Sequence, residues 1–155
     1  MLIMVTQKSE SAVKTQFVGT WVLMSFEFRL SDGTATYPLG KDVAGLIMYD
    51  ANGHVSAQLM RKDRPNFASG DQQKGTAEEI KAAFEGYVAY FGDYVIDEDE
   101  KAVIHRPTGA MFPNWIGQDQ KRFYEFSGDQ LTLTTPPIQM DGVKIVGTLI
   151  WKRHS

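Results

Sequence analysis

The most constraining feature of the sequence is a pair of tryptophan-bearing segments near its two ends. Gly19 stands two residues before Trp21 at the start of the first long apolar run, and residues 150–153 end the last run with Trp151 and Arg153. A glycine lets the backbone pass close over an indole ring, and an arginine can stack on the face of that ring. If the first and last strands meet in this way, the sheet closes into a barrel. We therefore assign Trp21, Trp151 and Arg153 to stability.

The composition fits one globular domain and excludes several classes of function. The chain has 155 residues, of which 43% are hydrophobic, enough for one sizeable core. Its formal net charge of -3 argues against a nucleic-acid partner. It contains no cysteine, which excludes disulfides and thiolate metal sites and is expected of a reducing compartment. No run approaches the length of a membrane span, so we expect a cytoplasmic protein without a membrane partner.

Strand-length runs separated by turn signals recur along the chain. The Asn52-Gly53 pair favours a tight hairpin, and Pro136-Pro137 ends a strand because proline cannot donate into a ladder. We expect eight strands, at residues 18–30, 44–49, 54–61, 89–97, 102–108, 118–126, 131–135 and 143–153. Between the third and fourth of these strands, Thr76 and Glu79 match a capping box that begins an amphipathic helix.

These elements predict an all-β fold class: an eight-stranded antiparallel up-and-down barrel with one inserted helix. Residues 1–16 are polar apart from a short apolar start and predict a flexible N-terminal arm, with residues 17–155 forming the barrel domain. Residues 62–75 show no regular period and predict a long loop of the kind that often acts as a lid or binding loop.

Strict alternation along the first strand divides its side chains between two faces. Trp21, Leu23, Ser25 and Glu27 share one face, and Val22, Met24, Phe26 and Phe28 share the other. If Trp21 points inward, Glu27 does so as well, and the second set forms an apolar outer stripe. Such a stripe needs a cover, either the inserted helix or a second copy of the chain. A homodimer is therefore one expected assembly.

Several longer strings closely resemble a family of bacterial and fungal lipocalin-like domain proteins. The opening Gly19-Thr20-Trp21 resembles the Gly-x-Trp start of lipocalins, in which an arginine of the final strand covers the tryptophan. The resemblance covers roughly residues 17–153 and includes the stretches 56–61, 64–65, 67–71, 86–92, 112–117 and 128–137. It implies a lipocalin-like barrel, and some relatives are associated with natural-product pathways and with ring-forming or isomerising steps. Unlike secreted lipocalins, the chain has no disulfide and no helix after the last strand.

Three residues are candidates for chemistry in such a barrel. His105 lies mid-strand and has a side chain suited to proton transfer near neutral pH. Arg122 and Tyr124 stand two apart and so share a face, where a guanidinium beside a phenol could hold a ligand oxyanion. The alternatives are a hydrogen-bonded structural histidine and a barrel-wall ion pair between Arg122 and Glu27. The candidate ligand-binding residues are Glu27, Ser56, Gln58, Met60, Tyr90, Tyr94, Asn114 and Trp115.

Two functions fit these residues. The first is a binding module that holds one small hydrophobic or aromatic molecule. The second is a cofactor-independent isomerase or cyclase in the same cavity, acting on a natural-product-like substrate with His105 as acid or base. The three histidines lack metal-ligand spacing, so we expect no metal and no cofactor. Hydrolase, nucleotide-binding and dehydrogenase motifs are absent from the sequence.

Overall fold

A computed structural model describes residues 11–155 and contains mostly strands. The expected arm falls mainly on residues 1–10, which lie outside the described residues, and its remainder includes a short helix. The elements are α1 (Ala12–Phe17), β1 (Gly19–Leu30), β2 (Ala35–Thr36), β3 (Val43–Tyr49), β4 (His54–Arg61), α2 (Ala77–Glu85), β5 (Tyr87–Asp97), β6 (Ala102–Ala110), η1 (Pro113–Trp115), β7 (Gln120–Ser127), β8 (Gln130–Thr134), β9 (Ile138–Met140) and β10 (Val143–Arg153).

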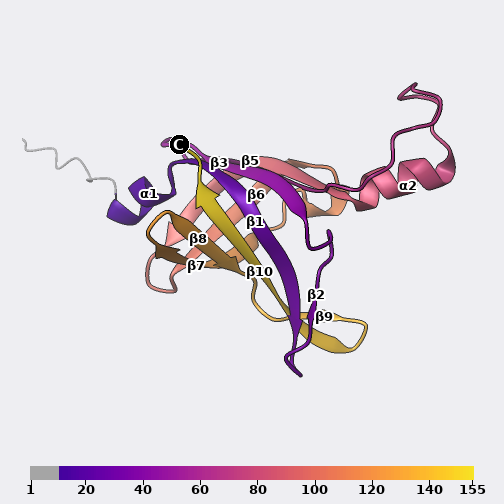
Figure 1. The fold of residues 1–155 in the computed structure, drawn as a ribbon. Coiled ribbons are helices and arrows are strands. Elements are labelled where there is room, and N and C mark those ends of the chain that lie inside the picture. The colour runs from indigo at the N-terminus through magenta and orange to yellow at the C-terminus, as the bar shows by residue number, and fades with distance from the viewer. Residues whose placement is uncertain (1–10) are drawn as a thin grey trace, which may run out of the picture.

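Eight of the strands close into an antiparallel barrel, as predicted. They follow the order β1-β3-β4-β5-β6-β7-β8-β10, and β10 pairs with β1 to complete the ring. The short strands β2 and β9 were not expected; they pair with β1 and β10 where these two strands extend beyond the rest of the barrel (Figure 1). No helix within residues 11–155 is long and apolar enough to cross a membrane.

The end of the barrel beside α1 is closed by packed aromatic side chains. Phe17 is fully buried and meets the ring of Tyr49 edge-on, with the ring centres 5.1 Å apart. The indole nitrogen of Trp21 donates to the Phe17 carbonyl oxygen at 2.9 Å. The guanidinium of Arg153 lies over the Trp21 ring, 4.1 Å from the ring centre. The predicted contact between the first and last strands is therefore confirmed.

Gly19 is required at the start of β1 for two reasons. Its φ of +133° is one that other residues rarely adopt. A Cβ at this position would also lie 2.9 Å from a guanidinium nitrogen of Arg153. The glycine therefore allows the arginine to reach over Trp21 and to donate to the Val18 carbonyl oxygen.

A β-bulge in β1 overturns the predicted division of its faces. Leu23 pairs with Trp151 but Ser25 pairs with Ile150, so Met24 is the extra residue. Because the bulge shifts the alternation by one residue, Phe26 and Phe28 turn into the barrel, whereas Trp21 and Leu23 face inward before it. The predicted outer stripe therefore keeps only Val22 and Met24, which weakens the basis for a homodimer.

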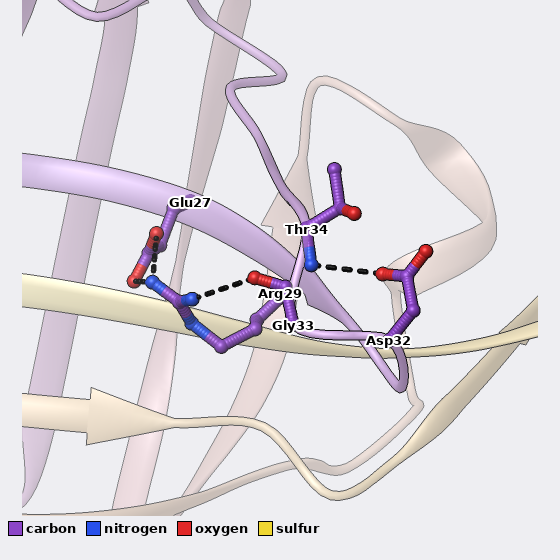
Figure 2. A network of polar contacts seen from close by, with 5 residues as sticks. All are labelled: Glu27, Arg29, Asp32, Gly33 and Thr34. Carbon is purple, nitrogen blue, oxygen red and sulfur yellow. Dashed lines mark hydrogen bonds and ion pairs between the residues drawn. The ribbon is translucent and has the colours of Figure 1, made fainter.

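The same shift turns Glu27 away from the barrel interior, where the sequence placed it. Its carboxylate accepts two hydrogen bonds from Arg29, at 3.0 and 3.1 Å, in the network of Figure 2. Arg29 also donates to the Gly33 carbonyl oxygen in the following turn. The carboxylate of Asp32 accepts from the backbone N–H of Thr34, which lowers the pKa of Asp32. Glu27 thus belongs to the polar network of the β1–β2 turn.

Helix α2 forms as predicted but does not cover the barrel as expected. The capping box is present, with reciprocal hydrogen bonds between Thr76 and Glu79. Glu79 also accepts from the backbone N–H of Ala68 and so ties the long loop to the helix. The helix has no buried residue, and its apolar residues Ile80 and Phe84 are 53% and 43% exposed. It projects from the barrel together with the loop (Figure 1).

Candidate ligand-binding site

The barrel encloses a cavity of about 470 Å³. Its opening lies away from α1, among the β2–β3 connection, the end of α2, η1 and β9. Most of the wall is apolar or aromatic, and the polar groups on it are few. The apolar lining includes Phe26, Phe28, Leu39, Ile47, Ala57, Leu59, Val88, Trp115, Leu133, Leu149 and Trp151, and the polar lining includes Glu85, Tyr90, His105, Gln120, Arg122 and Thr135.

Two tyrosines bracket the imidazole of His105. The Tyr49 hydroxyl lies 2.7 Å from Nε2 of His105, and the Tyr90 hydroxyl lies 2.6 Å from Nδ1. Tyr49 is at the closed end against Phe17, whereas Tyr90 lines the cavity and meets Trp115 near its opening. His105 itself is buried. The three side chains therefore form a polar chain from the closed end of the barrel into the cavity.

Burial sets the ionisation of all three groups. It lowers the pKa of His105 to about 3, and the positive charge of Arg122 adds to the effect. Burial also raises the pKa of Tyr49 and of Tyr90, although Arg122 acts against this shift. At neutral pH His105 is therefore a neutral imidazole, and Tyr49 and Tyr90 are both protonated phenols.

Arg122 supplies positive charge to the cavity wall. Its guanidinium donates to the Lys121 carbonyl oxygen at 2.8 Å and to the Gln120 side-chain oxygen at 3.3 Å. Across residues 11–155, it has no carboxylate within 4.0 Å. The barrel-wall pair with Glu27, one alternative from the sequence, is not formed, because the bulge in β1 turns Glu27 out of the barrel, where it pairs with Arg29.

Trp151 adds a buried donor on the opposite wall. Three strands separate β10 from β5 in either direction around the ring, so Trp151 stands across the barrel from Tyr90. Its indole N–H is buried and has no hydrogen-bond partner among the described residues. An unsatisfied buried donor costs free energy, and because the nitrogen is buried even with the cavity empty, the cavity wall is formed by other atoms of Trp151.

Four of the residues predicted for the site line this cavity: His105, Arg122, Tyr90 and Trp115. Tyr124 shares the inward face with Arg122, but it lies at the closed end, where its ring packs 5.1 Å from that of Phe17.

The remaining predicted residues lie elsewhere. Ser56, Gln58 and Met60 line a groove of about 660 Å³ on the outer surface of β1, β3 and β4. Tyr94 is buried below the cavity and donates to the Asp50 carbonyl oxygen at 2.6 Å. Asn114 lies in η1 beside Trp115 and is exposed.

Sequence reasoning missed Tyr49, Phe26, Phe28 and the cavity-facing role of Trp151. Tyr49 follows Ile47 by two residues, so the period of a buried strand could have placed it inside. The two phenylalanines were assigned to the wrong face because nothing in the local sequence marks the bulge at Met24. Among residues 11–155, no group of three or more histidine or carboxylate side chains could hold a metal ion.

Comparison with known proteins gives two matches. The model of a family described as "Lipocalin-like domain" matches residues 18–154. A 4'-hydroxy-3'-methoxypropiophenone carrier protein, ppsC, of Aspergillus oryzae is 32% identical over 106 residues, which cover 64% of this chain and 96% of that protein. The search of solved structures found no match.

Proposed function

This chain belongs to the lipocalin-like domain family, and on that premise we propose that it binds one small aromatic molecule in its barrel cavity and acts as a carrier. The observation that carries the proposal is the cavity itself, about 470 Å³ with a largely apolar and aromatic wall. Small-molecule sites commonly have volumes of roughly 300–1,000 Å³ and a few placed polar groups. The cavity has both properties.

The chemistry of the polar groups supports an oxygen-bearing ligand. Tyr90 on β5 and Arg122 on β7 both line the cavity, and each can donate a hydrogen bond. The similar carrier protein is named for a compound with a ketone, a phenol and a methoxy group on one aromatic ring. We propose an aryl ketone of that class as the ligand of this chain.

The isomerase or cyclase alternative assigned His105 as acid or base. Both ring nitrogens are engaged by tyrosines, and the low pKa of about 3 makes the imidazole a weak base at neutral pH. These features favour binding over turnover. The cytoplasmic location stays a prediction from the sequence.

Calorimetric titration with 4'-hydroxy-3'-methoxypropiophenone tests the proposal. We expect saturable binding of one molecule per chain, with a negative heat-capacity change because apolar surface is buried. Chromatography of the ligand after prolonged incubation with the protein should recover it unchanged. Absence of binding would refute the carrier function for this ligand class, and a converted product would favour the enzyme alternative.

A further inference from the structure

The donors and acceptors in the hydrogen-bonded row of Tyr49, His105 and Tyr90 can be deduced from the requirement that each buried polar group is satisfied. A neutral imidazole carries one N–H donor and one bare acceptor nitrogen. One tyrosine must therefore donate to His105 and the other must accept from it. The two possible arrangements differ in which hydroxyl proton is left over.

The leftover proton cannot belong to Tyr49 without cost. Tyr49 is 2% exposed, and the hydrogen bond that its hydroxyl makes among the described residues is the one to His105. If Tyr49 accepted from Nε2, its own proton would be buried without an acceptor, which costs about 1–3 kcal/mol. If Tyr49 donates to Nε2, that cost disappears. His105 then carries its proton on Nδ1 and donates it to Tyr90.

Tyr90 is the end of the chain that faces the cavity. Because its oxygen accepts from Nδ1 of His105, its hydroxyl proton is free to be donated to a molecule in the cavity. Arg122 lines the same cavity and adds positive charge there. A ligand atom at this position must therefore be an acceptor that carries partial negative charge.

We propose that Tyr90 is the donor that recognises a ketone oxygen of the ligand, and that Tyr49 is a positioning residue that fixes this polarity through His105. The inference rests on the proposed function and deepens it, since it names the ligand group and the protein atom that meet. A ligand whose carbonyl is replaced by a methylene group loses this contact and leaves the hydroxyl of Tyr90 unsatisfied.

The first arm of the test measures which ring nitrogen of His105 carries the hydrogen in the ligand-free protein. Long-range proton–nitrogen NMR of the His105 ring at neutral pH should show hydrogen on Nδ1 and a bare Nε2. In Tyr49→Phe the donor to Nε2 is gone, so a population with hydrogen on Nε2 should appear. Hydrogen on Nε2 in the wild-type protein, or an unchanged ring in Tyr49→Phe, would overturn the assignment.

The second arm compares two ligands that differ at one group. The probes are 4'-hydroxy-3'-methoxypropiophenone and 2-methoxy-4-propylphenol, in which the carbonyl is a methylene group. We expect the ketone to bind about tenfold more tightly, and Tyr90→Phe to remove this preference. Tyr87→Phe is the matched control, because the Tyr87 hydroxyl donates to Gln58 on the outer surface. That variant should keep the preference.

The outcomes separate the inference from the function on which it rests. If both compounds bind with equal affinity, or Tyr90→Phe weakens both alike, the cavity binds ligand but Tyr90 does not recognise the ketone. If neither compound binds to the wild-type protein, the proposed function fails, and the ketone assignment fails with it.

Discussion

The guanidinium of Arg153 lies 4.1 Å from the ring centre of Trp21, across the junction between the last strand and the first. Arg153 also donates to the carbonyl oxygens of Val18 and Gln16, which lead from α1 into β1. One side chain therefore joins the chain's last strand to the segment that closes the barrel end. Neither Arg153 nor Trp21 lines the cavity. Loss of this contact should therefore lower the stability of the fold without changing ligand binding.

Replacing Arg153 with alanine should destabilise the fold and leave ligand affinity unchanged. The loss of a stacked guanidinium and its hydrogen bonds should cost about 1–2 kcal/mol, which corresponds to a decrease of several degrees in Tm. Thermal unfolding measures the change, and Lys152→Ala is the neighbouring control, because Lys152 is exposed. An unaltered Tm for Arg153→Ala would argue against closure through this contact.

The bulge in β1 predicts opposite responses at two nearby residues. Phe26 faces the cavity, whereas Met24 is 54% exposed on the outer surface. A lysine at position 26 places a charge against the apolar wall and should cost about 2 kcal/mol or more. A lysine at position 24 should change stability by no more than about 0.5 kcal/mol. Without the bulge, both residues would share one face, and urea unfolding of the two variants would give similar losses.

The low pKa of His105 predicts a loss of stability in acid. The unfolded chain takes up a proton on this residue near pH 6.5, whereas the folded chain does so only near pH 3. Between these values the unfolded state binds more protons, so the free energy of unfolding falls as the pH falls, by up to about 1.4 kcal/mol per pH unit. The stability that comes from keeping His105 neutral is fully present above pH 6.5 and is lost as the pH falls below this value.

Urea unfolding of the wild-type protein and of His105→Gln at several pH values measures this effect. The stability difference between them should shrink as the pH falls from 7.5 to 4.5. His54 has a raised pKa because it binds Asp50, so its contribution has the opposite sign, but it is common to both proteins. In NMR titration of the wild-type protein, the His105 ring should stay neutral down to about pH 4.5. A difference that does not depend on pH, or a ring that titrates near pH 6.5, would contradict the account.

The closure of the barrel could be predicted because both of the strands that meet carry a sequence signal and because the longer strings resemble lipocalin-like proteins. Gly19 and Trp21 mark the first strand, and Arg153 can reach that tryptophan only if the last strand lies beside it. The start of α2 depends on a local signal, since Thr76 and Glu79 form its capping box with each other. A signal of this kind can be recognised without any long-range contact.

The cavity wall could be predicted only in part because it depends on register and on pairings across the barrel. The bulge at Met24 reverses the faces of the residues that follow it, and no residue type marks such a bulge. Tyr49 and His105 are 56 residues apart in sequence, and only the closed barrel brings them into contact. Alternation placed Arg122 and Tyr124 on one face correctly but could not tell the open end from the closed one.

The central claim is that the ligand lies inside the barrel, and calorimetry of two tryptophan variants tests it most directly. Val88 lines the cavity near its opening, and Leu46 lines the groove on the outer surface. Tryptophan at position 88 should fill the cavity and weaken binding of 4'-hydroxy-3'-methoxypropiophenone by about tenfold or more, while tryptophan at position 46 should change the affinity by about twofold at most. Thermal unfolding of both variants establishes that they are folded. Unchanged affinity in Val88→Trp together with weakened binding in Leu46→Trp would place the ligand in the outer groove and contradict the account.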